Sequence, residues 1–180
     1  MLSGRRPIMG FHNQRGQGTI FGVLATLALV LMVAGIVDLT RLWEFRLWGY
    51  RVTESAALAG LAKSRNYTEY MATGNITLDG TVAQQDAVAA LQEALNGRSG
   101  DLTNISYDVR VHEFSFSMGE YLNYPPVARA GMSGGAWAPG NPAVGVYLTF
   151  EVRPVLYGWV NGNEAIPIHV FASASIVEAQ

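Results

Sequence analysis

Residues able to perform chemistry are few and widely spaced in this sequence. The three histidines, His12, His112 and His169, lack the short spacing with which two ligands on one helix bind a metal ion. No G-x-S-x-G motif presents a serine nucleophile. The chain contains no cysteine, which excludes disulfide bonds, thiolate catalysis and cysteine-ligated metal sites. We therefore expect no catalytic residue, no metal and no cofactor, and we expect the protein to act by association.

Two groups of side chains are better suited to binding. Asp38 and Arg41 are one helical turn apart at the end of a long apolar segment, where we expect an ion pair that sets the depth of the helix in a membrane. Residues 119–142 are rich in proline and glycine and carry Tyr121, Tyr124 and Trp137. Because aromatic side chains anchor interfaces and long loops are often functional, we expect this loop to form an adhesive or subunit-contacting surface.

The overall composition limits the size of the fold and the class of partner. A chain of 180 residues is long enough for one compact domain with an appendage. Its formal net charge is −2, and acidic and basic residues are scattered without the basic stripe that a phosphate backbone requires. Nucleic acid is therefore not an expected partner.

One segment predicts a membrane span. Residues 18–37 contain no charged side chain, and as a helix these 20 residues would be roughly 30 Å long, the thickness of the hydrocarbon layer. A cleaved secretory signal is the alternative, but its apolar region is shorter and ends in a small-residue site, whereas this segment runs into Asp38. We expect a single-pass protein in contact with the lipid bilayer.

The orientation of the span depends on its flanking charges. Three arginines precede the segment and three follow it: Arg5, Arg6, Arg15, Arg41, Arg46 and Arg51. The later arginines alternate with acidic residues, and Trp43, Trp48 and Tyr50 resemble an aromatic belt at the outer interface. We therefore expect the N-terminus inside the cell and the C-terminal domain outside.

The helical pattern continues beyond the apolar segment. Apolar residues recur at three- and four-residue steps without proline, which predicts one helix over residues 18–63. Gly18 and Gly22 form a small-xxx-small motif that lets two membrane helices approach, and a second small-residue surface lies further along, where it could meet the chain's own sheet or a neighbouring subunit. The residues predicted to pack helix against helix are Gly18, Gly22, Ala56, Ala57, Ala59 and Gly60.

The remainder of the chain predicts an α+β domain. Residues 64–80 have the composition of a loop, Thr81 is placed to cap a helix that ends at Asn96 and Gly97, and strict alternation from Leu102 predicts a half-buried strand. Two later β-rich segments, residues 144–159 and 166–177, flank the hairpin signal at Asn161 and Gly162. We expect an antiparallel meander packed on the long helix, with boundaries at 1–15 for a basic tail or leader, 16–63 for the helix and 64–180 for the outer domain.

Four stretches together resemble a known family. Arg15-Gly16-Gln17 precedes the apolar segment, GIVDLTR ends it at residues 35–41, ESAALAG follows at 54–60, and ASASIVE closes the sheet region at 172–178. In their order and spacing, these four stretches resemble the corresponding stretches of the TadE/TadG-like proteins of tight-adherence (Tad, or Flp) pilus systems. The resemblance implies a pilin-like protein of the bacterial inner membrane, with its C-terminal domain outside the cytoplasm. It also implies pilin-like or membrane partners, a homo-oligomer or a surface filament.

The sequence departs from the family at its processing site. Members cleaved by a prepilin peptidase usually carry a glutamate five positions after the cleavage glycine, and counting from Gly16 this position is Phe21. We therefore expect cleavage between Gly16 and Gln17 to be inefficient or absent. Two other functions remain open at this stage: an accessory subunit of another membrane complex, and a membrane-tethered enzyme or ligand-binding domain.

Overall fold

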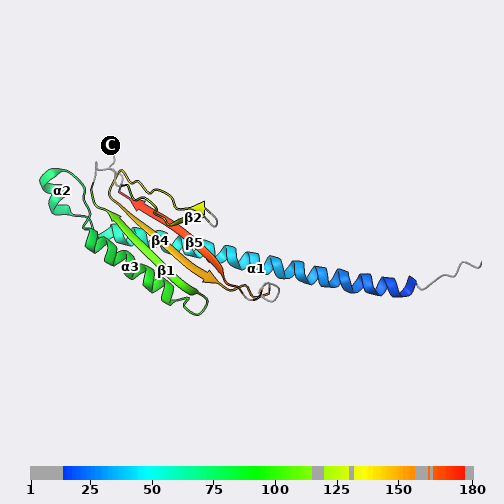
Figure 1. Cartoon of the computed structure of the whole chain (residues 1–180). Helices are drawn as coiled ribbons and strands as arrows, with labels where there is room; N and C mark the ends of the chain where they lie inside the picture. Colours follow the sequence, from blue (N-terminus) through cyan, green and yellow to red (C-terminus); the bar gives the residue numbers. More distant parts are fainter. Residues whose placement is uncertain (1–13, 115–119, 130–131, 157–161, 163, 177–180) are drawn as a thin grey trace, which may run out of the picture.

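A computed structural model describes residues 14–114, 120–129, 132–156, 162 and 164–176. A single helix, α1 (Gln14–Lys63), runs through the molecule and extends far beyond the rest of it (Figure 1). Its 50 residues correspond to a length of about 75 Å. The predicted continuous helix is confirmed within these bounds.

The second half of α1 packs on a three-stranded sheet. Strands β1 (Thr103–His112), β4 (Ala143–Val152) and β5 (Ile166–Ser175) lie in the order β1-β4-β5, and both pairs are antiparallel. The central strand β4 is almost entirely buried, whereas β1 and β5 form the edges. This arrangement confirms the predicted α+β class with a helix against an antiparallel sheet.

Helix α3 (Gly80–Asn96) lies beside α1 on the same face of the sheet (Figure 1). Its amphipathic pattern buries four apolar residues: Ala83, Ala87, Leu91 and Leu95. The helix ends before Gly97 as predicted, but its N-cap is Asp79 rather than Thr81. The Asp79 carboxylate accepts hydrogen bonds from two backbone amides at the start of the helix, which a threonine inside the first turn cannot do.

The small-residue surface of α1 meets α3 of the same chain. Ala56 and Ala57 are completely buried, and a Cβ atom on Gly60 would lie 2.7 Å from the carbonyl oxygen of Ala83. Only glycine permits this approach of two backbones. The sequence analysis named the chain's own sheet or a neighbouring subunit as the partner, and the structure shows α3 at this place; a contact with another subunit stays a prediction. Ala59 is partly exposed on another side of the helix.

Two segments predicted as loops contain regular structure. A short helix, α2 (Tyr67–Thr73), lies within 64–80, where the Asn66 side chain accepts from the amide of Glu69 and Gly74 ends the helix with a φ of 77°. Within 119–142, β2 (Val127–Arg129) and β3 (Met132–Ser133) form a small ribbon. Both elements are too short for a periodic pattern to predict them.

Candidate functional site

The apolar segment of α1, residues 18–37, is exposed except at Ala34 and Gly35, which are partly buried. Twelve large apolar side chains in it are between 47% and 68% exposed: Ile20, Phe21, Val23, Leu24, Leu27, Leu29, Val30, Leu31, Met32, Val33, Ile36 and Val37. A Cβ atom on Gly18 or Gly22 would meet nothing within 4 Å. Within the part of the chain that the structure describes, α1 is the one helix long and apolar enough to cross a membrane.

Asp38, directly after the apolar segment, joins α1 to the end of the sheet. The residue is only 4% exposed. Its carboxylate accepts a hydrogen bond from the amide of Val155 at 2.9 Å and from the amide of Leu156 at 3.0 Å. These amides belong to the loop that follows β4, so one side chain of α1 holds the β4–β5 loop against the point where the helix leaves the domain. Such hydrogen bonds to an ionised group are stronger than neutral ones.

Arg41 lies one turn further along the helix. Its Nη2 atom is 3.8 Å from the Asp101 carboxylate, and its guanidinium lies 5.6 Å from the centre of the Phe45 ring. The expected pairing of Arg41 with Asp38 stays a prediction. The structure instead assigns to Asp38 two backbone partners that are distant in sequence, which spacing along one helix could not reveal.

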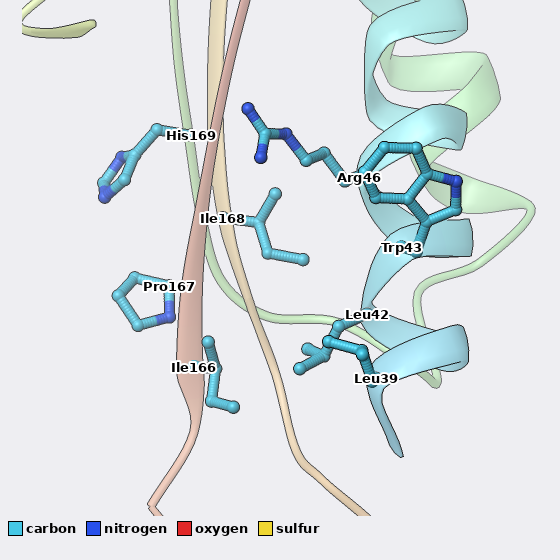
Figure 2. Close-up of a pocket in the computed structure, with 8 residues that line it drawn as sticks. All are labelled: Leu39, Leu42, Trp43, Arg46, Ile166, Pro167, Ile168 and His169. Carbon is cyan, nitrogen blue, oxygen red and sulfur yellow. The ribbon is translucent and has the colours of Figure 1, made fainter. Parts of the chain in front are cut away.

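A groove of about 380 Å³ opens between α1 and the edge strand β5. Figure 2 shows its lining: Leu39, Leu42, Trp43 and Arg46 from the helix, and Ile166, Pro167, Ile168 and His169 from the strand. The end of the groove nearest the apolar segment is lined by Leu39 and Ile166, whereas Arg46 and His169 lie at the opposite end (Figure 2). The His169 ring points away from α1 in Figure 2 and contacts Tyr147, so Arg46 is the charged side chain that borders the groove at this end.

A second hollow lies between α1 and the turn after α3. Its lining includes Arg41, Phe45, Arg98 and Asp101. The Arg98 guanidinium is 5.5 Å from the centre of the Phe45 ring, a cation–π contact that holds this cation beside the helix. Basic side chains thus accompany both hollows just beyond Asp38.

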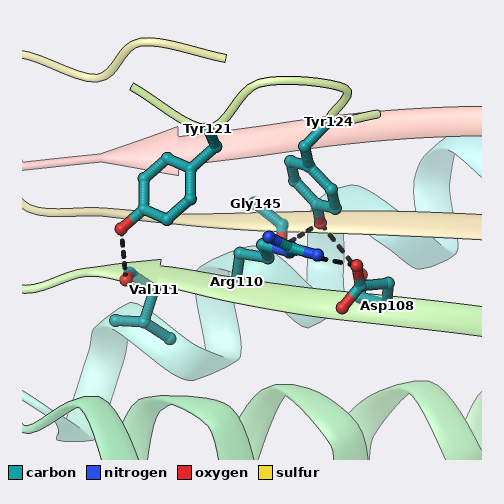
Figure 3. Close-up of polar contacts among 6 residues, drawn as sticks. All are labelled: Asp108, Arg110, Val111, Tyr121, Tyr124 and Gly145. Carbon is teal, nitrogen blue, oxygen red and sulfur yellow. Dashed lines mark hydrogen bonds and ion pairs between the residues drawn. The ribbon is translucent and has the colours of Figure 1, made fainter. Parts of the chain in front are cut away.

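The aromatic residues predicted to form an interaction surface pack on the sheet instead of facing outward. Tyr124 and Trp137 are buried, and the Tyr124 hydroxyl is 2.7 Å from the carbonyl oxygen of Gly145 and 2.9 Å from that of Asp108 (Figure 3). The Tyr121 hydroxyl donates to the carbonyl of Val111 at 2.9 Å. Burial raises the pKa of Tyr124 well above its usual value. These side chains fasten the described residues around them to the sheet face opposite the helices. A contact of this loop with another subunit stays a prediction.

No group of three metal-ligating side chains occurs among the described residues. The Tyr147 hydroxyl is 2.9 Å from Nδ1 of His169, and burial raises the pKa of Tyr147. A neutral tyrosine beside an imidazole is ordinary packing for two side chains on neighbouring strands.

Comparison with known proteins adds no relative. No family model, curated protein or solved structure matches this chain. The site must therefore be judged by its own geometry, which combines an exposed apolar helix, a buried carboxylate at its end and two hollows with basic residues.

Sequence reasoning located part of this site and missed the rest. It identified the apolar segment and Asp38. The predicted processing site, Gly16 and Gln17, lies in the first turn of α1, and residues 1–13 before it lie outside the described part. It missed the contact of Asp38 with the β4–β5 loop. The sequence placed Val155 and Leu156 inside a β-rich segment over residues 144–159, whereas β4 ends at Val152.

Proposed function

We propose that this chain is a single-span, membrane-anchored structural protein that acts in the assembly or structure of a Tad-like surface pilus. The observation that carries this proposal is the division of one unbroken helix into an exposed apolar part and a part that forms the core of an α+β domain. That division corresponds to the pilin-like architecture which the motif resemblance implies.

The exposed segment supports an anchor for an energetic reason. Burying one large apolar side chain is worth about 1.5–3 kcal/mol, so leaving the whole segment in water would be very unfavourable. Exposed apolar patches of this size mark membrane or protein contacts. Twenty consecutive uncharged residues match the thickness of a bilayer, which favours lipid as the surroundings of this segment.

The continuity of α1 supports a structural role. The helix runs from Gln14 to Lys63 with no proline, so the anchor and the core of the outer domain are one rigid element. Force or displacement at the membrane is then transmitted directly to the sheet. Gly18 and Gly22 can approach a helix of a second subunit, because no described residue of the chain lies within 4 Å of a Cβ atom placed on either glycine.

A labelling experiment tests the topology. Because the chain has no cysteine, Ser99→Cys and Ser3→Cys each introduce a single thiol. Ser99 is exposed in the turn after α3. A membrane-impermeant maleimide added to intact spheroplasts should modify Ser99→Cys and leave Ser3→Cys unlabelled until the membrane is permeabilised. The opposite pattern would refute the proposed orientation, and labelling of both would refute the span.

A deletion in the source bacterium tests the pilus role separately. Loss of the chain should reduce surface filaments seen by electron microscopy, and the full chain supplied in trans should restore them. Unchanged filaments in the deletion strain would exclude the pilus function even if the labelling supports a membrane anchor.

A further inference from the structure

We propose that residues 154–156 of the β4–β5 loop, together with Leu39 and Trp43 of α1, form a second contact of this protein with the lipid bilayer, at its headgroup boundary. This contact rests on the membrane span proposed above. It would turn a domain tethered by one helix into a domain held against the membrane surface in one orientation.

The depth of the loop follows from its hydrogen bonds. Asp38 is the first charged residue after the uncharged segment 18–37, so it marks the end of the hydrocarbon layer if that segment spans it. The Asp38 carboxylate binds the amides of Val155 and Leu156 at 2.9 and 3.0 Å. Val155 and Leu156 therefore lie at the same depth as the helix residue that leaves the bilayer.

The side chains at this depth are apolar and uncovered. Val155 is 49% exposed and Leu156 is 45% exposed, although their backbone amides are held at a buried carboxylate. Leu39 and Trp43 are also largely exposed on the neighbouring helix. Tryptophan is enriched at the membrane–water interface, because its ring is apolar and its N–H remains available to water or headgroups.

Basic side chains lie next to these exposed apolar side chains, on the side further from residues 18–37. Arg41 and Arg153 line a hollow of about 250 Å³ together with Val155, and Arg46 borders the groove in Figure 2 at the end further from the apolar segment. Two carboxylates offset part of this positive charge: Asp101 lines the same hollow as Arg41, and Glu44 lines the neighbouring hollow with it. An apolar surface followed outward by arginines matches a bilayer, in which acyl chains are followed by phosphate groups. This order favours lipid over a protein as the occupant.

The second contact has a mechanical consequence. A single helix leaves its domain free to rotate about the membrane normal and to tilt. Because Val155 and Leu156 lie on one side of α1, tilting the helix toward the opposite side would lift them out of the interface and expose them to water. The loop therefore orients the sheet and the outer face of the domain relative to the membrane.

Site-directed spin labelling of the full chain in vesicles tests this contact. Three variants, Leu156→Cys, Met71→Cys and Val30→Cys, are spin-labelled and reconstituted separately into vesicles of equal parts phosphatidylethanolamine and phosphatidylglycerol. Met71 is the matched control, an exposed apolar side chain on α2 at the end of the molecule far from the apolar segment (Figure 1). Val30 reports on the span itself. Collision rates with oxygen, which concentrates in lipid, and with a water-soluble nickel chelate define the surroundings of each label.

The expected result is that the label at Leu156 collides more often with oxygen than with the nickel chelate, and that the label at Met71 shows the reverse. If the Val30 label is in lipid while the Leu156 label is in water, the second contact is refuted and the span stands. A Leu156 label protected from both reagents would also overturn the inference, because it would show that protein covers the loop. A Val30 label in water would refute the span and, with it, the second contact.

Discussion

Replacing Asp38 by alanine removes the carboxylate that accepts hydrogen bonds from Val155 and Leu156 and so holds the end of the sheet against α1. Hydrogen bonds to charged groups contribute about 1.5–3 kcal/mol each, and two amides lose their partner in Asp38→Ala. Because Val155 and Leu156 are half-exposed, their freed amides regain some hydration, so we expect a net loss of about 2–4 kcal/mol. For a chain of this size, that corresponds to a melting temperature lower by about 5–15 °C.

The assay is thermal unfolding of the full chain in dodecylmaltoside micelles, followed by near-ultraviolet circular dichroism of the buried aromatic residues. Asp101→Ala is the matched control, because Asp101 is an exposed carboxylate whose ion pair with Arg41 should contribute less than about 1 kcal/mol. Asp38→Asn keeps one acceptor oxygen and should fall between the two. If Asp38→Ala melts within about 2 °C of the control, the buried carboxylate does not hold the loop and the reasoning is refuted.

Four other outcomes are expected. Gly22→Leu should leave the fold of a single chain unchanged, because a Cβ atom there meets nothing within 4 Å, but should weaken any oligomer seen on native gels; an unchanged oligomer would show that the glycine is incidental. Gly60→Leu should lower the free energy of unfolding by at least about 1–3 kcal/mol in denaturant titration, because its side chain overlaps α3. Burial raises the pKa of Tyr124 in the folded state, so wild-type stability should fall as pH rises above about 10, where the unfolded tyrosine ionises first, and Tyr124→Phe should show a shallower fall; equal slopes would contradict this. The intact mass of the protein purified from its native membrane should include residues 1–16, because Phe21 occupies the position of the glutamate that efficient cleavage requires. A mature N-terminus at residue 17 would contradict this expectation.

Much of the fold could be predicted because its elements carry local, periodic signals. The uncharged segment 18–37 and the three- and four-residue steps beyond it predict one helix, and α1 has nearly those bounds. Strict alternation predicts β1, and Asn96-Gly97 predicts the end of α3. Elements of a few residues, such as α2 and β2, were missed, because a pattern needs several periods before it differs from chance.

The candidate site was less accessible to sequence reasoning. Tyr124 and Trp137 have the residue types of an exposed interface, yet the loop folds back and buries them on the sheet. Composition alone could not separate these outcomes, because an aromatic ring gains similar free energy from either kind of burial. The hairpin expected at Asn161 and Gly162 lies largely outside the described residues, while β4 itself ends at Val152, before Pro154, which has no amide to donate.

The sequence by itself determined which stretch of this chain favours an apolar environment and how far the helix containing it extends, because charge and periodicity act between near neighbours. Only the tertiary structure decided that the small residues around Gly60 face the chain's own α3, and that Asp38 holds a loop 117 residues away. Such contacts depend on how complete elements pack, and a carboxylate has no local pattern that identifies its distant backbone partners. The apolar segment was therefore evident from composition, whereas the contact of Asp38 with Val155 and Leu156 could be recognised only in the folded chain.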